Sequence, residues 1–462
     1  MNMPSRRKVL NIAGRSLLTA GAAGALGRLS MMNAYAAPAS GYRALVCVFL
    51  FGGNDANNMV VPIATTKNMY TDYSTARQAV ALPQGSLLPV SAGSDTYGFH
   101  PAMTGLHNIY GSGKMAVLAN VGVLAQPLTV TQYKNKAGVV IPVNLFSHAD
   151  QQGQWQTDDP SGFGTTGWAG RVADLVGPAF NTTPAGSTLP FPAAISISGN
   201  NMLEVGGSSS PAIVTSAGPS TLTNFPTTPN ARTQAFMNLL SFDNGVQLVQ
   251  SANGITQAGV NDASVCNLAL ASSTYNPTTF PNTSLGGQLK MVARIINVHQ
   301  KLGANRQIFF VSMGGFDNHD KLLTDQSTNL GQVSDAVATF YNEMKNTLML
   351  DQDVTVFTES DFSRTNQPNT SNGSDHAWGS HHMIVGGAVQ GGVWGTFPDV
   401  KIQGADDVTG RGVFLPTTSL DQYGATLARW IGVADGDLPN VFSNLKKFET
   451  TARPLGTLGF MG

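Results

Sequence analysis

Three apolar runs of strand length, each followed directly by polar and acidic residues, constrain the fold of this chain most strongly. The runs are ALVCVFL at 44–50, QIFFVS at 307–312 and VTVFT at 354–358. They lead into GGND at 52–55, GGFDNH at 314–319 and ESD at 359–361. Continuous apolar runs of this length are typical of strands buried on both faces. Each strand is therefore predicted to deliver acidic groups just beyond its carboxyl end.

The segment between the second and third runs predicts how those strands are connected. Apolar residues recur there at helical spacing, namely at Leu330, Val333, Val337, Phe340, Tyr341, Met344 and Leu348. A strand, a helix and a strand of these lengths form a right-handed crossover with parallel strands. Parallel strands bring their carboxyl ends to one edge of the sheet, where open α/β folds place ligands. If the first run joins this sheet, one crevice collects Asp55, Asp317, His319, Glu359 and Asp361.

Such a group of carboxylates predicts a metal site. Neighbouring carboxylates raise one another's pKa and burial adds to the cost, whereas a divalent cation removes it. Asp317-x-His319 and Asp375-His376 add imidazoles. Mixed oxygen and nitrogen ligands are common at Zn, Mn or Fe sites. Taken one at a time, each acid is also explained as a helix cap or a turn residue.

Residues 1–36 are predicted to be an export signal rather than part of the fold. The leader is basic and then apolar, has no Asp or Glu, and ends at the cleavage pattern Ala34-Tyr35-Ala36. SRRKVL at 5–10 resembles the signal read by the twin-arginine export machinery. The alternatives are an ordinary secretory signal and an uncleaved anchor. Arg15 and Arg28 interrupt the apolar part, which falls short of the roughly 20 residues of a membrane span. We expect a soluble mature protein, without a span, in the periplasm or outside the cell.

The charge balance argues against a nucleic-acid partner. Removal of the leader lowers Lys plus Arg from 26 to 21 and leaves Asp plus Glu at 27. Phosphate binding needs clustered Lys and Arg, and the sequence has no such cluster. Two cysteines, Cys47 and Cys266, cannot form a disulfide framework. They are interpreted as packed thiols, with a single bridge as the alternative.

Four motifs together resemble a known family. They are LFGGNDANN at 50–58, GGFDNH at 314–319, TESDFSRT at 358–365 with GSDHAWG at 373–379, and DQYGATLARW at 421–430. The chain resembles the secreted family catalogued as domain of unknown function 1501, over nearly all of its mature length. That family is placed in the alkaline-phosphatase-like superfamily of phosphatases and sulfatases. The resemblance implies a single domain at 41–462 with a doubly wound, mostly parallel sheet sandwiched by helices, and a bimetal hydrolase.

The resemblance also implies metal ligands. Asp55 matches the Asp after the first strand, Asp317 and His319 match two ligands of one metal, and His376 matches the last histidine. Glu359 and Asp361 supply acids for the other metal, but Phe362 stands where an imidazole is expected. The second metal site is therefore expected to be poor in nitrogen, which leaves Zn, Mn, Mg or Ca, or a single metal, open.

The catalytic groups are predicted from the same resemblance. Ser147 is the candidate nucleophile, with a helix N-cap as the equal alternative. His148 is interpreted as a ligand, a substrate contact or a structural histidine. Arg364 is predicted to clamp an anionic oxygen, or else to pair with Asp361. One of His381 and His382 is expected to face the site and the other to face away.

Two polar segments frame the site. Residues 181–230, with short alternating runs such as AISIS at 194–198, are predicted to be an inserted loop-and-strand region that lies over the core. Residues 366–373 are interpreted as a solvated turn.

These observations predict an exported, metal-dependent hydrolase of anionic esters, acting on a small phosphate or sulfate ester or on a phosphorylated or sulfated polymer. The alternatives are a metal-binding protein with a degenerate catalytic site and an envelope- or carbohydrate-binding protein with a structural metal.

Overall fold

The fold comes from a computed structural model that describes residues 41–136, 138–219, 230–242 and 245–462. The predicted export signal at 1–36 lies outside the described residues. Tyr42–Gly462 form one compact unit. In the described part of the chain, no helix is both long and apolar enough to cross a membrane.

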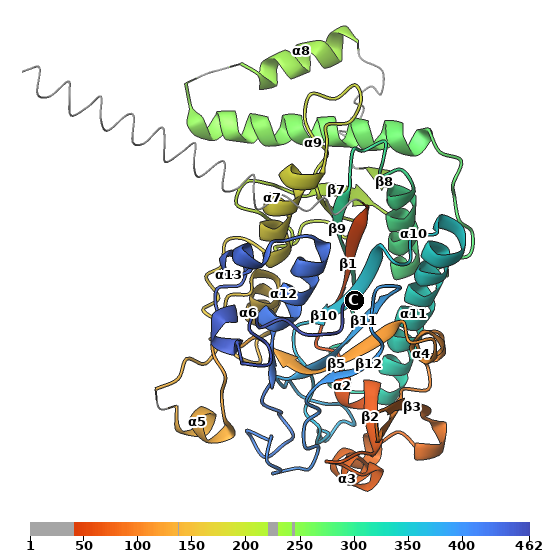
Figure 1. The fold of residues 1–462 in the computed structure, drawn as a ribbon, viewed down its shortest axis with the longest axis vertical. Helices are drawn as coiled ribbons and strands as arrows, with labels where there is room; N and C mark the ends of the chain where they lie inside the picture. The colour runs from red at the N-terminus through yellow and green to blue at the C-terminus, as the bar shows by residue number, and fades with distance from the viewer. Residues whose placement is uncertain (1–40, 137, 220–229, 243–244) are drawn as a thin grey trace, which may run out of the picture. The chain divides into compact units, whose positions relative to one another are not determined.

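A ten-stranded sheet is the centre of this unit (Figure 1). Its order is β12 (Gly392–Gly395), β5 (Met115–Gly122), β11 (Ser380–Gly386), β10 (Val354–Ser360), β1 (Arg43–Leu50), β9 (Arg306–Met313), β6 (Ala194–Ser196), β7 (Ala212–Thr215) and β8 (Gly218–Pro219), with β13 (Thr418–Ser419) beside β5. β1 pairs in parallel with both β9 and β10, in the registers Ala44 to Gln307 and Ala44 to Val354. Only β11 and β8 run antiparallel to their neighbours in this sheet. The predicted mostly parallel α/β sheet is therefore confirmed.

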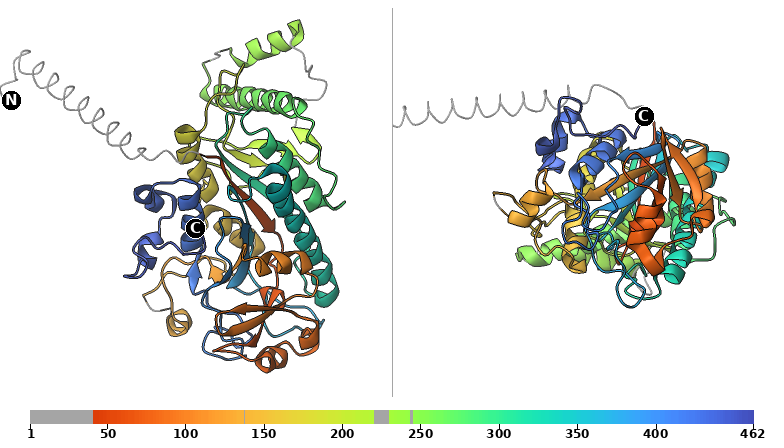
Figure 2. Two further views of the ribbon diagram at one scale, coloured as in Figure 1. Left: turned by 45° about the vertical axis from the view of Figure 1, so that its right-hand side comes forward. Right: turned by 90° about the horizontal axis from the view of Figure 1, so that it is seen from below.

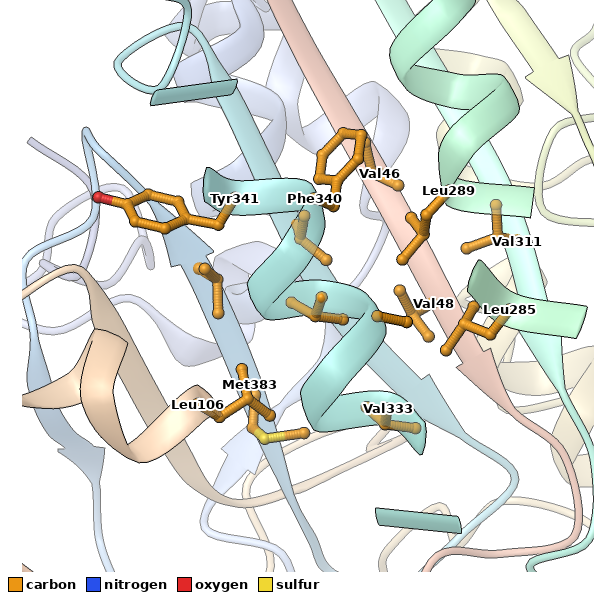
Figure 3. Packing of buried hydrophobic residues seen from close by; sticks show 14 of the residues in the cluster. Val46, Val48, Leu106, Leu285, Leu289, Val311, Val333, Phe340, Tyr341 and Met383 are labelled. Carbon is orange, nitrogen blue, oxygen red and sulfur yellow. The ribbon is translucent and has the colours of Figure 1, made fainter. Parts of the chain in front are cut away.

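One face of the sheet is covered by α4 (Thr104–Gly111), α10 (Ser284–Asn297) and α11 (Leu322–Glu343). Val46 and Val48 of β1 pack there in one cluster with Leu289 of α10 and with Val333 and Phe340 of α11 (Figure 3). α11 is the predicted crossover helix between β9 and β10, and it continues into a π-helical turn at Met344–Leu348.

The other face is covered by α6 (His148–Thr157), α7 (Trp168–Phe180), α12 (Leu420–Ile431) and α13 (Leu438–Val441). The alternate residues of β1, Leu45, Cys47 and Phe49, pack on this side in a second cluster that includes Trp168 and Tyr423. Because a strand directs successive side chains to opposite faces, a run that is apolar throughout is buried on both sides. The helices on both faces confirm the doubly wound arrangement.

The remaining elements surround this sandwich, as the two further views in Figure 2 show. A small antiparallel sheet contains β2 (Val60–Ala64), β4 (Asp95–Phe99) and β3 (Leu88–Ala92). The other α-helices are α2 (Ala56–Met59), α3 (Tyr70–Arg77), α5 (Val130–Asn135), α8 (Ala231–Leu240) and α9 (Gln247–Ala271). Short 3₁₀ turns lie at Gln78–Val80, Gln84–Ser86, Asp435–Asp437 and Leu445–Phe448.

The prediction for residues 181–230 is wrong in one respect. This segment does not only lie over the core, because β6 pairs in parallel with β9 and β7 pairs in parallel with β6. It therefore extends the central sheet; residues 220–229 lie outside the described residues. Cys47 and Cys266 are both buried and free, as the interpretation as packed thiols predicts.

Candidate metal centre

The candidate site lies at the carboxyl edge of the sheet, where the loops after β1, β9 and β10 meet. Gly52 and Gly53 follow β1 with φ values of +111° and +79°. A Cβ atom at Gly52 would lie 2.5 Å from the backbone nitrogen of Asp317, and one at Gly53 would lie 2.4 Å from the ring of Phe362. Glycine is therefore required at both positions, for its positive φ and for the close approach of the other two loops.

Three histidines from different segments direct their Nε2 atoms at one carboxylate. Oδ1 of Asp317 lies 3.4 Å from Nε2 of His148, 3.1 Å from Nε2 of His319 and 3.6 Å from Nε2 of His376. The ligand atoms of His148, Asp317 and His376 all lie within 4.8 Å of one another. His319 contacts two members of this trio. Its Nε2 lies close to Oδ1 of Asp317 and 2.9 Å from Nε2 of His376. We call these four residues the histidine cluster.

Each imidazole of the histidine cluster is fixed through its other ring nitrogen. Nδ1 of His148 lies 2.7 Å from Oδ2 of Asp361, and Nδ1 of His376 lies 2.6 Å from the carbonyl oxygen of Phe146. Nδ1 of His319 lies 3.3 Å from Oδ1 of Asp375. An acceptor at Nδ1 favours the proton there and leaves Nε2 to face the centre of the cluster, which is the usual arrangement of histidines that bind metal. Nε2 of His319 also lies 3.4 Å from Nη1 of Arg364.

Asp361 is the anchor of His148. It is fully buried, and its Oδ2 also accepts from Gln152 Nε2 at 2.9 Å and from the backbone N–H of Gly52 at 3.2 Å. His148 and Gln152 lie four residues apart in α6, so both side chains reach the same carboxylate. Asp361 therefore orients His148 through Oδ2, while its Oδ1 is buried without a hydrogen bond and remains a predicted ligand atom.

The residues present fit a metal ion. Nε2 of His148 is buried and makes no hydrogen bond, although it lies 3.4 Å from Asp317. A buried nitrogen without a partner is costly, and a cation would satisfy it. The buried ring of Phe362 packs under the imidazoles of His148 and His376, at centroid distances of 4.8 and 4.7 Å. Three nitrogens and one oxygen form a ligand set suited to a transition metal such as Zn²⁺.

The histidine cluster is open to solvent on one side. The side chains of Asp317 and His319 are 48% and 46% exposed, whereas His376 is 24% exposed. Burial alone would raise the pKa of Asp317, but the hydrogen bond and charge of Arg364 outweigh it and lower that pKa. Burial lowers the pKa of the His376 imidazole, which favours its neutral form. An ionised carboxylate beside the neutral imidazole of His376, reachable from outside, is suited to a metal that meets a substrate.

Two predicted ligands do not join the histidine cluster. Asp55 is fully buried, pairs with Arg77 at 2.7 Å, and accepts from Ser374 and from the backbone N–H groups of Asn57 and Asn58. All of its acceptor capacity is used, because it caps α2 and neutralises a buried guanidinium. Glu359 is also fully buried, and burial raises its pKa well above the usual value while Trp168 donates to its Oε1 at 3.2 Å. Glu359 is therefore a buried carboxyl beside Trp168 and does not belong to the histidine cluster.

The predicted role of Arg364 as an anion clamp is corrected by its contacts. The side chain is fully buried. Its donors contact the carbonyl oxygens of Gly52, Gly53, Phe316 and Ser374, Nε2 of His319 and Oδ1 of Asp317. A guanidinium has five N–H groups, and these partners use them all. Arg364 therefore braces the loops and Asp317, and it has no donor left for a substrate.

Ser147 directly precedes His148 at the N-cap of α6. Its Oγ donates to Asp150 Oδ2 at 2.5 Å, and it makes no side-chain capping bond. The hydrogen bonds from Ser147 and Asn144 lower the pKa of the Asp150 carboxyl, which makes it a weak base. Ser147 is therefore the sequence neighbour of one member of the histidine cluster, and its hydroxyl is hydrogen-bonded to Asp150.

The other candidate histidines lie away from the histidine cluster. His381 and His382 of β11 are both buried, and neither faces the site, contrary to the expectation for one of them. His381 packs on Phe397, and His382 packs between Trp155 and Tyr423. The sequence had left three interpretations of His148 open, and its contacts with Asp361 and Asp317 favour a ligand. Gln152 and Asp375 were missed as orienting residues; the spacing of His148 and Gln152 on one helix face was the available signal.

Comparisons with known proteins give a family and distant structural likenesses. The sequence profile described as "Protein of unknown function (DUF1501)" matches residues 42–418. No curated protein matches the chain. Among solved structures, the zinc complex of the C-terminal periplasmic domain of EcEptC from Escherichia coli is 10% identical, with coverage of 89% of this chain and 88% of that one and a TM-score of 0.35. A structure from work on glycosaminoglycan metabolism by Bacteroides thetaiotaomicron is 11% identical, with coverage of 86% and 74% and a TM-score of 0.33. Likeness at these TM-scores defines neither the fold nor the chemistry of this chain.

Proposed function

The chain belongs to the DUF1501 family of proteins of unknown function, and we propose that it is an exported, metal-dependent hydrolase of phosphate or sulfate esters. One observation carries the proposal: three imidazoles, each with an acceptor at Nδ1, direct their Nε2 atoms at one half-exposed carboxylate. A doubly wound sheet with its site at the carboxyl edge also supports the alkaline-phosphatase-like relationship that the motifs imply.

The proposed ligands are His148, Asp317, His319 and His376. Nitrogen-rich sites favour Zn²⁺ or a similar transition metal over Mg²⁺ and Ca²⁺, which prefer oxygen ligands. One ion per chain is proposed, because Asp55 is engaged by Arg77 and Glu359 is buried against Trp168, outside the histidine cluster. The ring of Phe362 fills the floor of the site where a further imidazole was expected.

When bound, the ion would polarise an ester oxygen and favour deprotonation of the attacking group. Asp361 and Asp375 hold His148 and His319 in the ligating tautomer, and Arg364 holds Asp317 ionised. Open access at Asp317 and His319 admits the ester. The nucleophile is either water or Ser147, whose hydroxyl is bonded to Asp150.

The test combines metal analysis with turnover. Purified mature protein, with its metal content measured, is assayed on aryl phosphate and aryl sulfate with and without chelator. The expected result is one ion per chain and hydrolysis that chelator abolishes and metal restores. His148→Ala should remove both metal and activity. His107 lies in α4, and its Nε2 is hydrogen-bonded to the carbonyl oxygen of Pro89; His107→Ala is the matched control that should keep both. Loss of activity in Ser147→Ala with full metal content would assign the attack to Ser147, and retained activity would assign it to water.

A second candidate is a non-catalytic metal-binding protein. The observation that favours it is the complete use of the Arg364 donors and of the Ser147 hydroxyl within the protein, which leaves no dedicated clamp for an ester. Full metal occupancy without turnover of either aryl ester would support this candidate and overturn the hydrolase.

Export remains part of the proposal and is carried by the Arg6-Arg7 pair. Replacement of both arginines by lysine should retain the precursor in the cytoplasm if the twin-arginine machinery reads them. Cell fractionation measures this, and unchanged export would point to an ordinary secretory route.

A further inference from the structure

A polar pocket of about 570 Å³ lies beside the histidine cluster. Its walls come from the turn at Gln78 and Ala79, from the loop at 367–372, and from Arg411. Asp375 belongs to both the pocket and the site, because it lines the pocket while its Oδ1 lies 3.3 Å from Nδ1 of His319. A ligand in this pocket is therefore one carboxylate away from a proposed metal ligand.

The pocket walls are fastened to one another by the backbone. The N–H of Gln367 donates to the carbonyl oxygen of Arg411 at 3.1 Å, and that of Asn366 donates to Gly412 at 3.0 Å. Arg77, next to Gln78, donates to the carbonyl oxygen of Thr365 at 3.0 Å. In the segment at 366–373 the two ends, Asn366 and Gly373, are buried, whereas residues 370–372 are exposed, so its tip is the solvated turn that its composition indicated. The pocket is open to solvent, and its volume is within the usual range for small-molecule sites.

The side chains of Asp407 and Asn369 stabilise the pocket loops by hydrogen bonds to backbone N–H groups. Both oxygens of the buried Asp407 accept from backbone N–H groups, which belong to Gln403, Thr409, Gly410, Gly412 and Val413. Asn369 accepts from the N–H groups of Ser371 and Gly373 and donates to Asp375. The loops therefore keep their conformation without a ligand.

The unused polar groups of the pocket are neutral. Within the described residues, no hydrogen bond uses the side chains of Gln78, Gln367, Thr370 or Asn372, all of which line the pocket. Arg411 and Asp375 pair at 2.8 Å, so their charges offset each other. Amides and hydroxyls both donate and accept, as the hydroxyls of a sugar do. Ala79, Pro368 and the carbon atoms of the longer side chains add apolar surface, on which the ring face of a sugar can pack.

We propose that the substrate is a phosphate or sulfate ester of a sugar, with the sugar ring in this pocket and the ester group at the histidine cluster. This inference rests on the proposed hydrolase function, and it adds the class of the esterified group. Gln367 and Thr370 are specificity residues that hydrogen-bond the sugar hydroxyls, and they take no part in ester cleavage.

The kinetic test compares two kinds of ester on one enzyme. Hexose 6-phosphates and hexose 6-sulfates are compared with p-nitrophenyl phosphate and p-nitrophenyl sulfate. Gln367→Ala and Thr370→Ala should each raise KM for the hexose esters by about three- to tenfold, the usual loss for one neutral hydrogen bond, with little change in kcat. KM for the aryl esters should not change. Gln84→Ala, at an exposed glutamine outside the pocket, is the matched control and should change neither.

A binding test separates this inference from the proposed function. Saturation-transfer NMR with unesterified glucose and galactose needs no turnover, and Gln367→Ala should weaken the signal while Gln84→Ala should not. If the sugars bind through Gln367 but no ester is cleaved, the sugar pocket stands and the hydrolase proposal fails. If esters are cleaved but the pocket variants leave the KM of hexose esters unchanged, or raise that of aryl esters equally, the sugar-ester inference is overturned and the hydrolase stands.

Discussion

Five of the chain's eight histidines lie in two groups with different hydrogen bonding. His148, His319 and His376 belong to the histidine cluster, and we call His381 and His382 of β11 the core group. In the histidine cluster, Nδ1 of each imidazole faces an acceptor, as Nδ1 of His376 faces the carbonyl oxygen of Phe146. In β11, Nδ1 of His381 accepts from the backbone N–H of Asn120 at 3.0 Å, so the proton is on Nε2. The first arrangement frees Nε2 for a metal and the second does not. The partner of Nδ1 therefore distinguishes His376 in the histidine cluster from His381 in β11.

The largest expected effect is loss of metal from the histidine cluster. His148→Ala and His376→Ala each remove a ligand, and the affinity for Zn²⁺ should fall on the order of 1,000-fold, more than the 10–100-fold typical of changes around a ligand. Competition with a fluorescent chelator measures the affinity. His382→Phe is the control from the core group and should keep the metal. Equal loss in His382→Phe would remove the distinction between the two groups.

The next effect contrasts two aspartates that follow parallel strands. Asp55→Asn should lower the free energy of unfolding by about 3–5 kcal/mol, because it leaves the buried guanidinium of Arg77 without its counter-ion. Metal content should be unchanged. Asp317→Asn should instead lose metal, and it should lose less stability than Asp55→Asn, because the carboxylate that pairs with the buried Arg364 is itself half-exposed. Urea unfolding and metal analysis of both variants check this, and metal loss in Asp55→Asn would return that residue to the site.

A smaller effect is expected from the residue that orients His148. Asp361→Asn replaces an acceptor of His148, Gln152 and Gly52 by an amide, which no longer fixes the tautomer so firmly. The affinity for Zn²⁺ should fall about 10–100-fold without loss of the site. Chelator competition measures the change. A loss as large as that in His148→Ala would instead make Asp361 a ligand.

The smallest effect is a pH dependence that comes from the core group. Burial lowers the pKa of His381 and of His382 to about 3, below the value near 6.5 expected in the unfolded chain. Below pH 6.5 the unfolded state binds protons that the folded state excludes, so stability present at neutral pH is lost as the pH falls. Each histidine contributes a slope of about 1.4 kcal/mol per pH unit. His382→Phe should reduce the slope of unfolding free energy between pH 6 and pH 4 by about that amount, measured by urea titrations. An unchanged slope would mean that His382 is already protonated in the folded state.

The framework of the site followed from the sequence because it depends on local patterns. Runs that are apolar at every position, such as 44–50, belong to strands covered on both faces, and parallel pairing then brings Asp317 and Asp361 to one edge. The capping box at Ser419 and Gln422, which begins α12, is equally local. The strands at 194–196 and 212–215 were assigned to an insertion because they are too short to reveal their partners, which are β9 for the first and β6 for the second.

The roles of the individual acids did not follow, because they depend on distant partners. Asp55 and Asp317 look alike in sequence, but Arg77 reaches only the first of them. His148 meets Asp361 across 213 positions of sequence, and no spacing rule predicts that contact. For Arg364 the sequence predicted a cation available to a substrate, because it stands alone in a polar stretch. Its side chain instead donates to backbone carbonyl oxygens from distant segments.

The glycine pair after β1 also has a kinetic consequence. Gly52 lies against the backbone of Phe316 and Asp317, and Gly53 lies against the ring of Phe362. The N–H of Gly52 donates to Oδ2 of Asp361, 309 residues away in the sequence. Contacts of such high order form slowly, since the entropy of closing long loops is lost before they contribute stability. The metal-binding geometry can therefore arise only after β1, β9 and β10 have come into register. The rate at which refolding protein captures Zn²⁺ should follow the slowest folding phase, so that ion uptake reports the completion of the fold.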